Sequence, residues 1–205
     1  MDILVGTTNS GKLAEIEGTL GDLPLRIISL KSLGEWPKFE EDGSTFEENA
    51  RKKARIFAEF SGCFTLADDS GLEVDALGGV PGVYSARYSG PGTDDGKNNG
   101  KLLHELTDVP KERRGARFVC VIALCAPTSL GGGEWIFRGE CEGWIAFSPR
   151  GENGFGYDPL FFYPPLGKTF AEIDPAAKGR VSHRGRALRK LKEALPSLFS
   201  LGTNP

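Results

Sequence analysis

The chain of 205 residues has few of the residue types that build metal cages and disulfide scaffolds. It contains four cysteines, none of them spaced as C-x-x-C, and only two histidines. These numbers argue against a structural zinc site. Cys120 and Cys125 lie in one apolar run and are interpreted as small buried hydrophobic residues.

Long apolar runs are also missing, because no stretch of 18 apolar residues occurs. The N-terminus begins directly with the strand-like residues 2–5. We therefore expect neither a signal peptide nor a membrane span, which favours a cytoplasmic protein. The net charge is only −3, so we expect no surface for nucleic acid or for an anionic membrane. An anionic ligand would have to be small and be held by a local basic cluster.

Apolar residues make up 39% and charged residues 26% of the chain, which is typical of an ordinary globular protein. Strand and helix patterns alternate along the sequence, and this alternation predicts an α/β fold. Strands are expected over residues 3–6, 25–30, 64–67, 118–126, 134–138, 142–147 and 160–162. Helices are expected after residue 9, after Thr45, over 101–106 and over 186–195, and a frayed tail is expected from Gly202.

The helix after Thr45 is the clearest in the sequence. Thr45 and Glu48 form a capping box, and an apolar stripe follows at helical spacing. Asn49 and Lys53 fall on this stripe, where a lysine is costly unless it meets a partner or an anionic ligand. Lys53 could instead extend along the edge of the stripe toward water. Both interpretations are open.

The segment from Gly6 to Lys12 nearly matches a Walker A loop, but Leu13 stands where that loop needs Ser or Thr for magnesium. A strand–turn–helix junction still offers backbone N–H groups to an anion, and Lys12 adds a positive charge. The alternative is a plain turn in which Asn9 or Ser10 caps the helix.

Acidic residues suggest a metal site. Asp68 and Asp69 stand where the strand over 64–67 is expected to turn, and Glu40, Glu41 and Asp42 precede the capped helix. Magnesium prefers a few carboxylates together with water and phosphate, and a nearby carboxylate could take a proton from water. Acidic turns on a protein surface are the competing interpretation.

Two segments nearer the C-terminus carry candidate ligand contacts. One is a basic run that contains Lys178, Arg180, His183, Arg184 and Arg186. Ser182 is a good N-cap, which would place His183 and Arg184 in the first turn of a helix. Cations are disfavoured there by the helix dipole. An acidic or oxygen-rich partner would compensate these two cations, and a solvated basic face is the alternative.

The second segment is the loop 153–159. Phe155 could stack on a purine while Asp158 accepts a hydrogen bond, or the loop could be a tight turn with a buried phenylalanine.

Six segments of the chain together resemble the inosine/xanthosine triphosphate pyrophosphatase family. They are TTNSGK at 7–12, Glu41 with TFEENA at 45–50, ADDSGL at 67–72, GVYSARY at 82–88, GFGYDP at 154–159 and SHR at 182–184. Each is weak alone, but their order and spacing span nearly the whole chain. Leu13, which departs from Walker A, is normal in this family.

The resemblance implies an α/β fold with two lobes around a long mixed β-sheet, a central active-site cleft, one domain over residues 1–205 and a homodimer. It also implies hydrolysis of the triphosphates of non-standard purines (inosine, deoxyinosine and xanthosine) to the monophosphate and pyrophosphate. Mg²⁺ would be bound by Glu41 and Asp69, and Asp69 would activate water. The triphosphate would be held by Thr7, Thr8, Asn9, Ser10, Gly11, Lys12 and Lys53, with Asn49 and Ser70 as further substrate contacts. The base and sugar would be enclosed by Phe155, Gly156, Tyr157, Asp158, Lys178, His183 and Arg184.

Three other functions remain open from the sequence. A related pyrophosphatase could act on modified pyrimidine or methylated triphosphates. A P-loop phosphotransferase would release orthophosphate or phosphorylate an acceptor, and a nucleotide-sensing module would bind without turnover.

Overall fold

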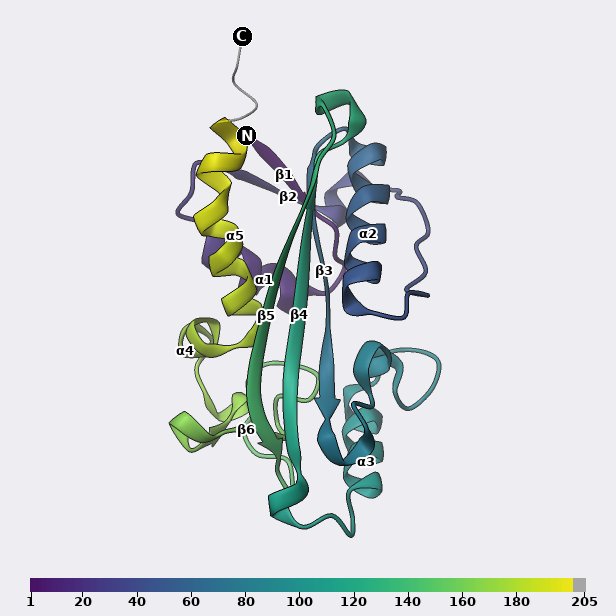
Figure 1. Ribbon diagram of the computed structural model, residues 1–205, viewed down its shortest axis with the longest axis vertical. Coiled ribbons are helices and arrows are strands. Elements are labelled where there is room, and N and C mark those ends of the chain that lie inside the picture. Colours follow the sequence, from purple (N-terminus) through teal and green to yellow (C-terminus); the bar gives the residue numbers. More distant parts are fainter. Residues whose placement is uncertain (201–205) are drawn as a thin grey trace. The chain divides into compact units, whose positions relative to one another are not determined.

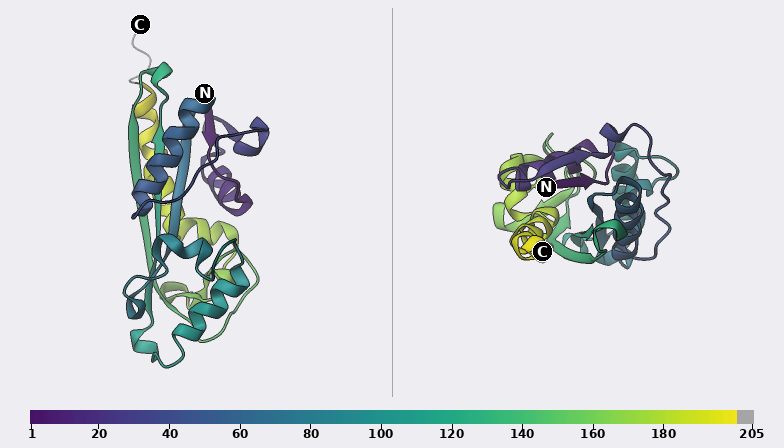
Figure 2. Two further views of the ribbon diagram at one scale, coloured as in Figure 1. Left: turned by 90° about the vertical axis from the view of Figure 1, so that its right-hand side faces the viewer. Right: turned by 90° about the horizontal axis from the view of Figure 1, so that it is seen from above.

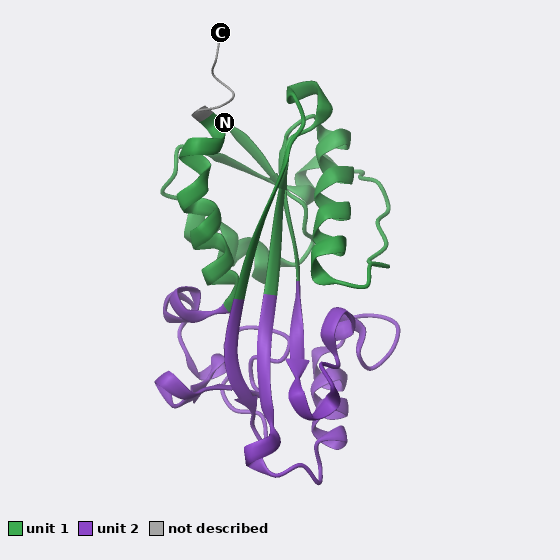
Figure 3. Cartoon of the chain, viewed as in Figure 1, with its two compact units in different colours: residues 1–69, 120–139, 183–205 green, residues 70–119, 140–182 purple. Residues whose placement is uncertain are grey.

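The computed structural model describes residues 1–200, so the frayed tail expected from Gly202 lies outside the described residues. The chain divides into two compact units (Figure 3). Unit 1 comprises Met1–Asp69, Cys120–Gly139 and the chain from His183 on, and unit 2 comprises Ser70–Val119 and Glu140–Ser182. The strands β3 (Phe64–Val74), β4 (Gly115–Cys125) and β5 (Glu134–Ile145) each have residues in both units.

The strands form one mixed sheet in the order β2-β1-β3-β4-β5-β6-β7. Strand β1 (Asp2–Val5) pairs in parallel with β2 (Arg26–Ser29) and with β3. At the other end of the order, β6 (Phe161–Tyr163) pairs in antiparallel with β5 and with β7 (Lys168–Thr169). The expected α/β class with a mixed sheet is confirmed.

The core of unit 1 follows from the alternation of side chains along β1. Ile3 and Val5 pack against α1 (Ser10–Leu20) and α5 (His183–Ser200), whereas Leu4 packs against Phe57 of α2 (Phe46–Ser61). Figures 1 and 2 show α2 and α5 on opposite sides of the strands of this unit. One four-residue strand therefore anchors helices on both of its faces.

Helix α2 forms as its sequence predicts. The Thr45 hydroxyl accepts the N–H of Glu48 at 3.1 Å, and the Glu48 carboxylate turns back to the N–H and hydroxyl of Ser44. The helix ends at Gly62, whose φ of 67° lies in the left-handed region that favours glycine. Because the stripe of α2 is buried, the side chains of Asn49 and Lys53 are buried with it.

Unit 2 has its own core, in which β3, β4 and β6 pack with α3 (Asp95–Glu105). Phe118, Phe161 and Phe170 form its aromatic centre, with ring centroids 4.7 to 5.9 Å apart. Such aromatic pairs add roughly 0.5–1.5 kcal/mol each beyond their buried area.

Two expectations about strands were wrong. The acidic turn expected at Asp68 and Asp69 is instead the middle of β3, which continues to Val74 because the buried carboxylates have cationic and amide partners. The two strands expected over 134–138 and 142–147 are one strand, β5. Its polar centre includes Gly139, where an added Cβ would lie 2.2 Å from the His183 carbonyl, so this glycine permits the close approach of α5 rather than a turn.

Helix boundaries also differ from the expectation. The helix expected over 101–106 begins at Asp95, and the short helix α4 (Pro175–Val181) was not foreseen. None of the helices within residues 1–200 is both long and apolar enough to cross a membrane.

Candidate active site

The turn between β1 and α1 sets the first group of candidate residues. Gly6 lies so close to α2 that an added Cβ would be 2.8 Å from a ring carbon of Phe57. Asn9 is the N-cap of α1, and its side-chain oxygen accepts the N–H of Lys12 at 3.0 Å. The cap predicted as one alternative is therefore present, and the start of α1 still offers backbone N–H groups beside exposed Thr8 and Ser10.

Lys12 is directed by a buried carboxylate. Its Nζ lies 3.0 Å from Oδ2 of Asp68, whose side chain is only 1% exposed. The same oxygen accepts Nε of Arg184 at 3.2 Å, and Arg184 also pairs with Glu15 of α1. Burial disfavours the charged form of Asp68, but the charges of Lys12, Arg184 and Lys53 outweigh it and hold the pKa of Asp68 well below its usual range.

Lys53 reaches the same place from α2. Its Nζ donates to Oε1 of Glu41 at 2.6 Å and to the backbone carbonyl of Asp68 at 2.9 Å. Burial lowers the pKa of Lys53, but Glu41 and Asp68 outweigh this effect, so the net shift is upward and the ammonium stays charged. The outward path considered for Lys53 is thus not taken: the side chain is 9% exposed and has an acidic partner.

Asp69, next along β3, has different partners. Its Oδ2 accepts Nδ2 of Asn49 at 2.9 Å, and the Asn49 oxygen accepts the N–H of Gly43 at 2.8 Å. Burial raises the pKa of Asp69, and the nearby negative charge of Glu41 raises it further. A buried carboxyl with a raised pKa is a stronger proton acceptor when it is ionised, which suits a general base.

Glu41 and Asp69 also fit a divalent cation. After burial, the negative charge of Glu41 is the next cause of the raised pKa of Asp69, so the two carboxylates lie near each other, and the Glu41 side chain is 29% exposed. Among residues 1–200 no group of three or more His, Cys, Asp or Glu side chains is arranged to hold a metal ion. Two carboxylates without further protein ligands suit a cation that keeps water and phosphate as its other ligands, as Mg²⁺ does.

We call these unit 1 residues the charged cluster: Lys12, Glu15, Glu41, Asn49, Lys53, Asp68, Asp69 and Arg184. The sequence analysis named six of them as site residues and placed Asp68 among the acidic candidates for a metal site, but it missed Glu15. A signal was available for Glu15, because it lies three residues after Lys12 and therefore on the same side of α1.

The aromatic loop predicted to bind a base lies in unit 2. Asp158 is buried, and its Oδ2 accepts Nζ of Lys178 at 2.5 Å and the N–H of Phe155 at 3.0 Å. Nζ of Lys178 lies 4.7 Å from the centre of the Phe155 ring, which is half-buried. Tyr157 is buried and donates its hydroxyl to the carbonyl of Ser85 at 2.8 Å. Of the two aromatic rings, Phe155 is therefore the one that remains partly exposed.

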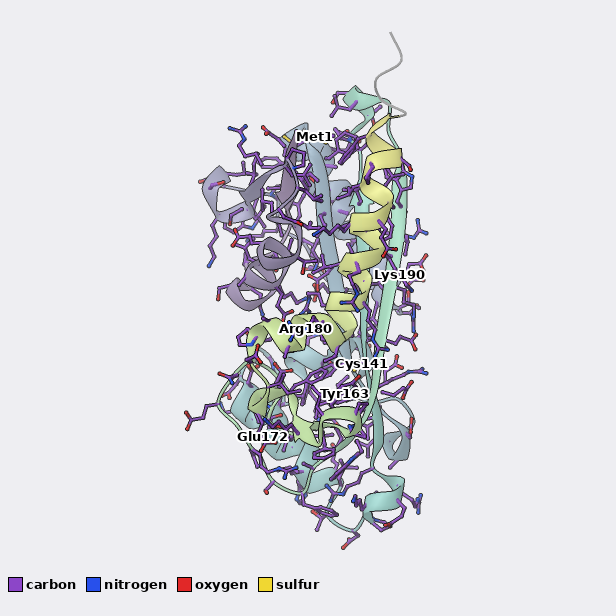
Figure 4. The ribbon with its side chains drawn as sticks, turned by 90° about the vertical axis from the view of Figure 1, so that its left-hand side faces the viewer. Met1, Cys141, Tyr163, Glu172, Arg180 and Lys190 are labelled. Atoms are coloured by element: carbon purple, nitrogen blue, oxygen red, sulfur yellow. The ribbon has the colours of Figure 1, made fainter. Side chains whose placement is uncertain are left out.

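The other candidate positions follow their elements. Ser70 is half-buried on β3, and His183 is buried in the first turn of α5. Arg180 on α4 and Lys190 on α5, both labelled in Figure 4, are exposed. Arg186 is exposed too, so the solvated interpretation fits Arg180 and Arg186, whereas Arg184 has the acidic partners that its helix position called for.

Comparison with known proteins places these residues in a family. The model of the Ham1 family matches residues 3–194. The chain is 56% identical over 193 residues to the dITP/XTP pyrophosphatase of Geobacter sulfurreducens, covering 94% of this chain and 96% of that protein. It is 50% identical over 199 residues to the dITP/XTP pyrophosphatase of Exiguobacterium sibiricum, covering 97% and 99%. Among solved structures, a HAM1 protein from Coxiella burnetii has a TM-score of 0.87 at 44% identity, covering 96% of this chain and 99% of that one. The chain belongs to the Ham1 family.

Proposed function

We propose that the protein hydrolyses the triphosphates of non-standard purine nucleosides, namely inosine, deoxyinosine and xanthosine, to the monophosphate and pyrophosphate. The observation that supports it most is the charged cluster, in which two buried or half-buried lysines lie beside a carboxyl group of raised pKa. The names of the relatives, dITP/XTP pyrophosphatases, support the choice of substrate.

In this proposal the polyphosphate binds at the start of α1. The backbone N–H groups of Thr8, Ser10 and Gly11 and the ammonium groups of Lys12 and Lys53 bind its oxygens, while the N–H groups of Thr7 and Asn9 hold the turn together. Both lysines are held in place before substrate arrives, Lys12 by Asp68 and Lys53 by Glu41. Such preorganised charges stabilise the negative charge that develops on the pyrophosphate leaving group.

Asp69 accepts the proton of the water that attacks the α-phosphorus, so that the α–β bond breaks and pyrophosphate leaves intact. The hydrogen bond from Asn49 orients its carboxylate. Glu41 and Asp69 would hold Mg²⁺, which when bound supplies positive charge to the phosphate oxygens.

Base recognition is assigned to Phe155 and Lys178 in unit 2. A purine stacked on Phe155 would lie near the ammonium group of Lys178, because Nζ of Lys178 is 4.7 Å from the centre of the Phe155 ring. A 6-oxo group accepts a hydrogen bond from this ammonium group, whereas the 6-amino group of adenine is itself a donor and cannot accept one from Lys178. Gly156, Tyr157, Asp158 and His183 would complete the contacts, and Ser70 would contact substrate.

We infer that Arg184 orients Lys12 through Asp68, since the N–H groups of Arg184 are directed to the carboxylates of Asp68 and Glu15.

We further infer that the whole chain, residues 1–205, is one catalytic domain that forms a homodimer, as the family resemblance implies, and that it acts in the cytoplasm. The test of the function is product analysis with inosine triphosphate and Mg²⁺. We expect equal amounts of inosine monophosphate and pyrophosphate. Orthophosphate as the product would support a phosphotransferase instead, and nucleotide binding without turnover by the wild type would support a sensing module. Faster turnover of modified pyrimidine triphosphates would overturn the substrate assignment.

A further inference from the structure

Helix α3 holds both backbone groups of one glycine in the aromatic loop. The N–H of Gly156 donates to Oδ2 of Asp95 at 2.6 Å, and Nδ2 of Asn99 donates to the carbonyl of Gly156 at 3.0 Å. Asp95 and Asn99 are four residues apart on α3, so they lie on the same side of the helix. We call these two side chains the α3 clip.

The α3 clip holds the backbone of Gly156, between the two aromatic residues of the loop. Gly156 has a φ of 63°, and it joins half-buried Phe155 to buried Tyr157. Tyr157 is fixed by Ser85, and the N–H of Phe155 is fixed by Asp158. Gly156 is the remaining link, and it is the most flexible residue type in an unfolded or loosened segment. The α3 clip therefore restrains the backbone next to Phe155, from which the ring projects.

The neighbouring Asn98 shows what a purely structural residue of this helix does. It is buried, its oxygen accepts the N–H of Ser89 at 2.8 Å, and its amide donates to the carbonyl of Ala86 at 3.2 Å. Asp95 is exposed and Asn99 is half-buried, and their bonds go to the aromatic loop instead. Because little apolar area is buried by the clip residues, changing them should spare the core of unit 2.

We propose that Asp95 and Asn99 are positioning residues that set the affinity for the purine base by fixing the Phe155 ring, an inference that rests on the proposed function. A stacking contact depends on the offset and tilt of the two rings. A loop that samples several orientations of Phe155 binds the base more weakly, while the lysines of the charged cluster in unit 1 keep their contacts. The clip thus acts on the nucleoside part of the substrate and leaves the polyphosphate part unchanged.

The experiment compares Asp95→Ala and Asn99→Ala with the control Lys97→Ala. Lys97 lies in the same helix, and its exposed side chain pairs with the helix cap Asp94 in a surface contact. For each variant, KM and kcat with inosine triphosphate are measured, together with the binding of inosine monophosphate and of pyrophosphate by calorimetry. From the usual value of one hydrogen bond, we expect KM and the dissociation constant of inosine monophosphate to rise about three- to tenfold in both clip variants. The affinity for pyrophosphate, kcat and the control variant should stay near wild type.

Asp95→Asn keeps an acceptor for the Gly156 N–H and should recover much of the loss, which also keeps the test informative if Asp95→Ala folds poorly. Unchanged monophosphate binding in the clip variants would overturn the inference, and so would an equal loss of pyrophosphate affinity or a fall of kcat at constant KM. If the wild type releases no pyrophosphate from inosine triphosphate, the proposed function fails, yet the binding of the monophosphate still reports separately on the clip.

Discussion

Replacing Lys53 by methionine should change the stability of the protein little and lower its activity strongly. The bond from Nζ of Lys53 to Glu41 is 2.6 Å long. At that distance and an effective dielectric constant of about 20, the attraction is about 6 kcal/mol. Against it stands a desolvation cost of several kcal/mol per buried ion. Methionine fills a similar volume without that cost, and the 29% exposed Glu41 side chain can be rehydrated. We expect the free energy of unfolding to change by only about 1 kcal/mol.

Activity should respond much more strongly to the same change. If Lys53 stabilises the charge that develops on the phosphates, its loss should cost about 3–4 kcal/mol of transition-state stabilisation, or a factor of about 10²–10³ in kcat/KM. Pyrophosphate release from inosine triphosphate and urea unfolding monitored by circular dichroism measure the two effects.

Lys52→Met is the matched control for this experiment. Lys52 is the adjacent residue on α2, but its side chain is 41% exposed and pairs with Asp42, which is 62% exposed. Such surface pairs contribute at most about 1 kcal/mol. We expect Lys52→Met to keep wild-type turnover. The role of Lys53 is refuted if Lys53→Met folds and retains kcat/KM within about threefold of wild type, a change far below the expected loss.

Three further predictions concern the carboxylates. Burial and then Glu41 raise the pKa of Asp69, and the base works only when ionised, so kcat/KM should fall as the pH drops through this raised pKa, as pH–rate profiles would show. The pKa of Asp68 is lower when folded than when unfolded, so its stabilisation is present at neutral pH. Asp68→Asn should lose about 3–5 kcal/mol in urea unfolding at pH 7, because Arg184 is 1% exposed and loses the charge of one carboxylate partner. A loss below about 1 kcal/mol would contradict the buried ion pairs. Mg²⁺ at 100 times its dissociation constant should add about 2.7 kcal/mol to the free energy of unfolding, seen as a higher Tm. The double variant Glu41→Gln with Asp69→Asn should lose this effect. An equal rise of Tm in the double variant would place the cation elsewhere.

Much of unit 1 could be predicted because local signals agree with each other. Thr45 and Glu48 cap α2, the stripe of α2 is apolar, and Lys53 is anomalous on that stripe. An anomaly of this kind marks a partner, and the partner is Glu41. The spacing that put a lysine on a buried face therefore pointed to a partner as one of two interpretations, and the bond to Glu41 decides between them.

The errors arose where tertiary contacts override local composition. Asp68 and Asp69 look like a turn, yet both are buried in β3 because Lys12, Arg184 and Asn49 reach them from other elements. Arg184 lies 116 residues from Asp68 in the chain, and no local pattern connects them. Successive residues of a strand point to opposite faces, so the two carboxylates have different partners and opposite pKa shifts.

The charge balance of the cluster explains why a divalent cation would matter before any chemistry. Four carboxylates, those of Glu15, Glu41, Asp68 and Asp69, face three cationic side chains, those of Lys12, Lys53 and Arg184. The lysines are thus already neutralised, and a bare triphosphate would meet a site with a slight excess of negative charge. One divalent cation at Glu41 and Asp69 reverses the sign of this balance. Omitting Mg²⁺ should therefore weaken the binding of a non-hydrolysable nucleotide as well as stop turnover, whereas a cation that serves the chemical step alone would leave that binding unchanged.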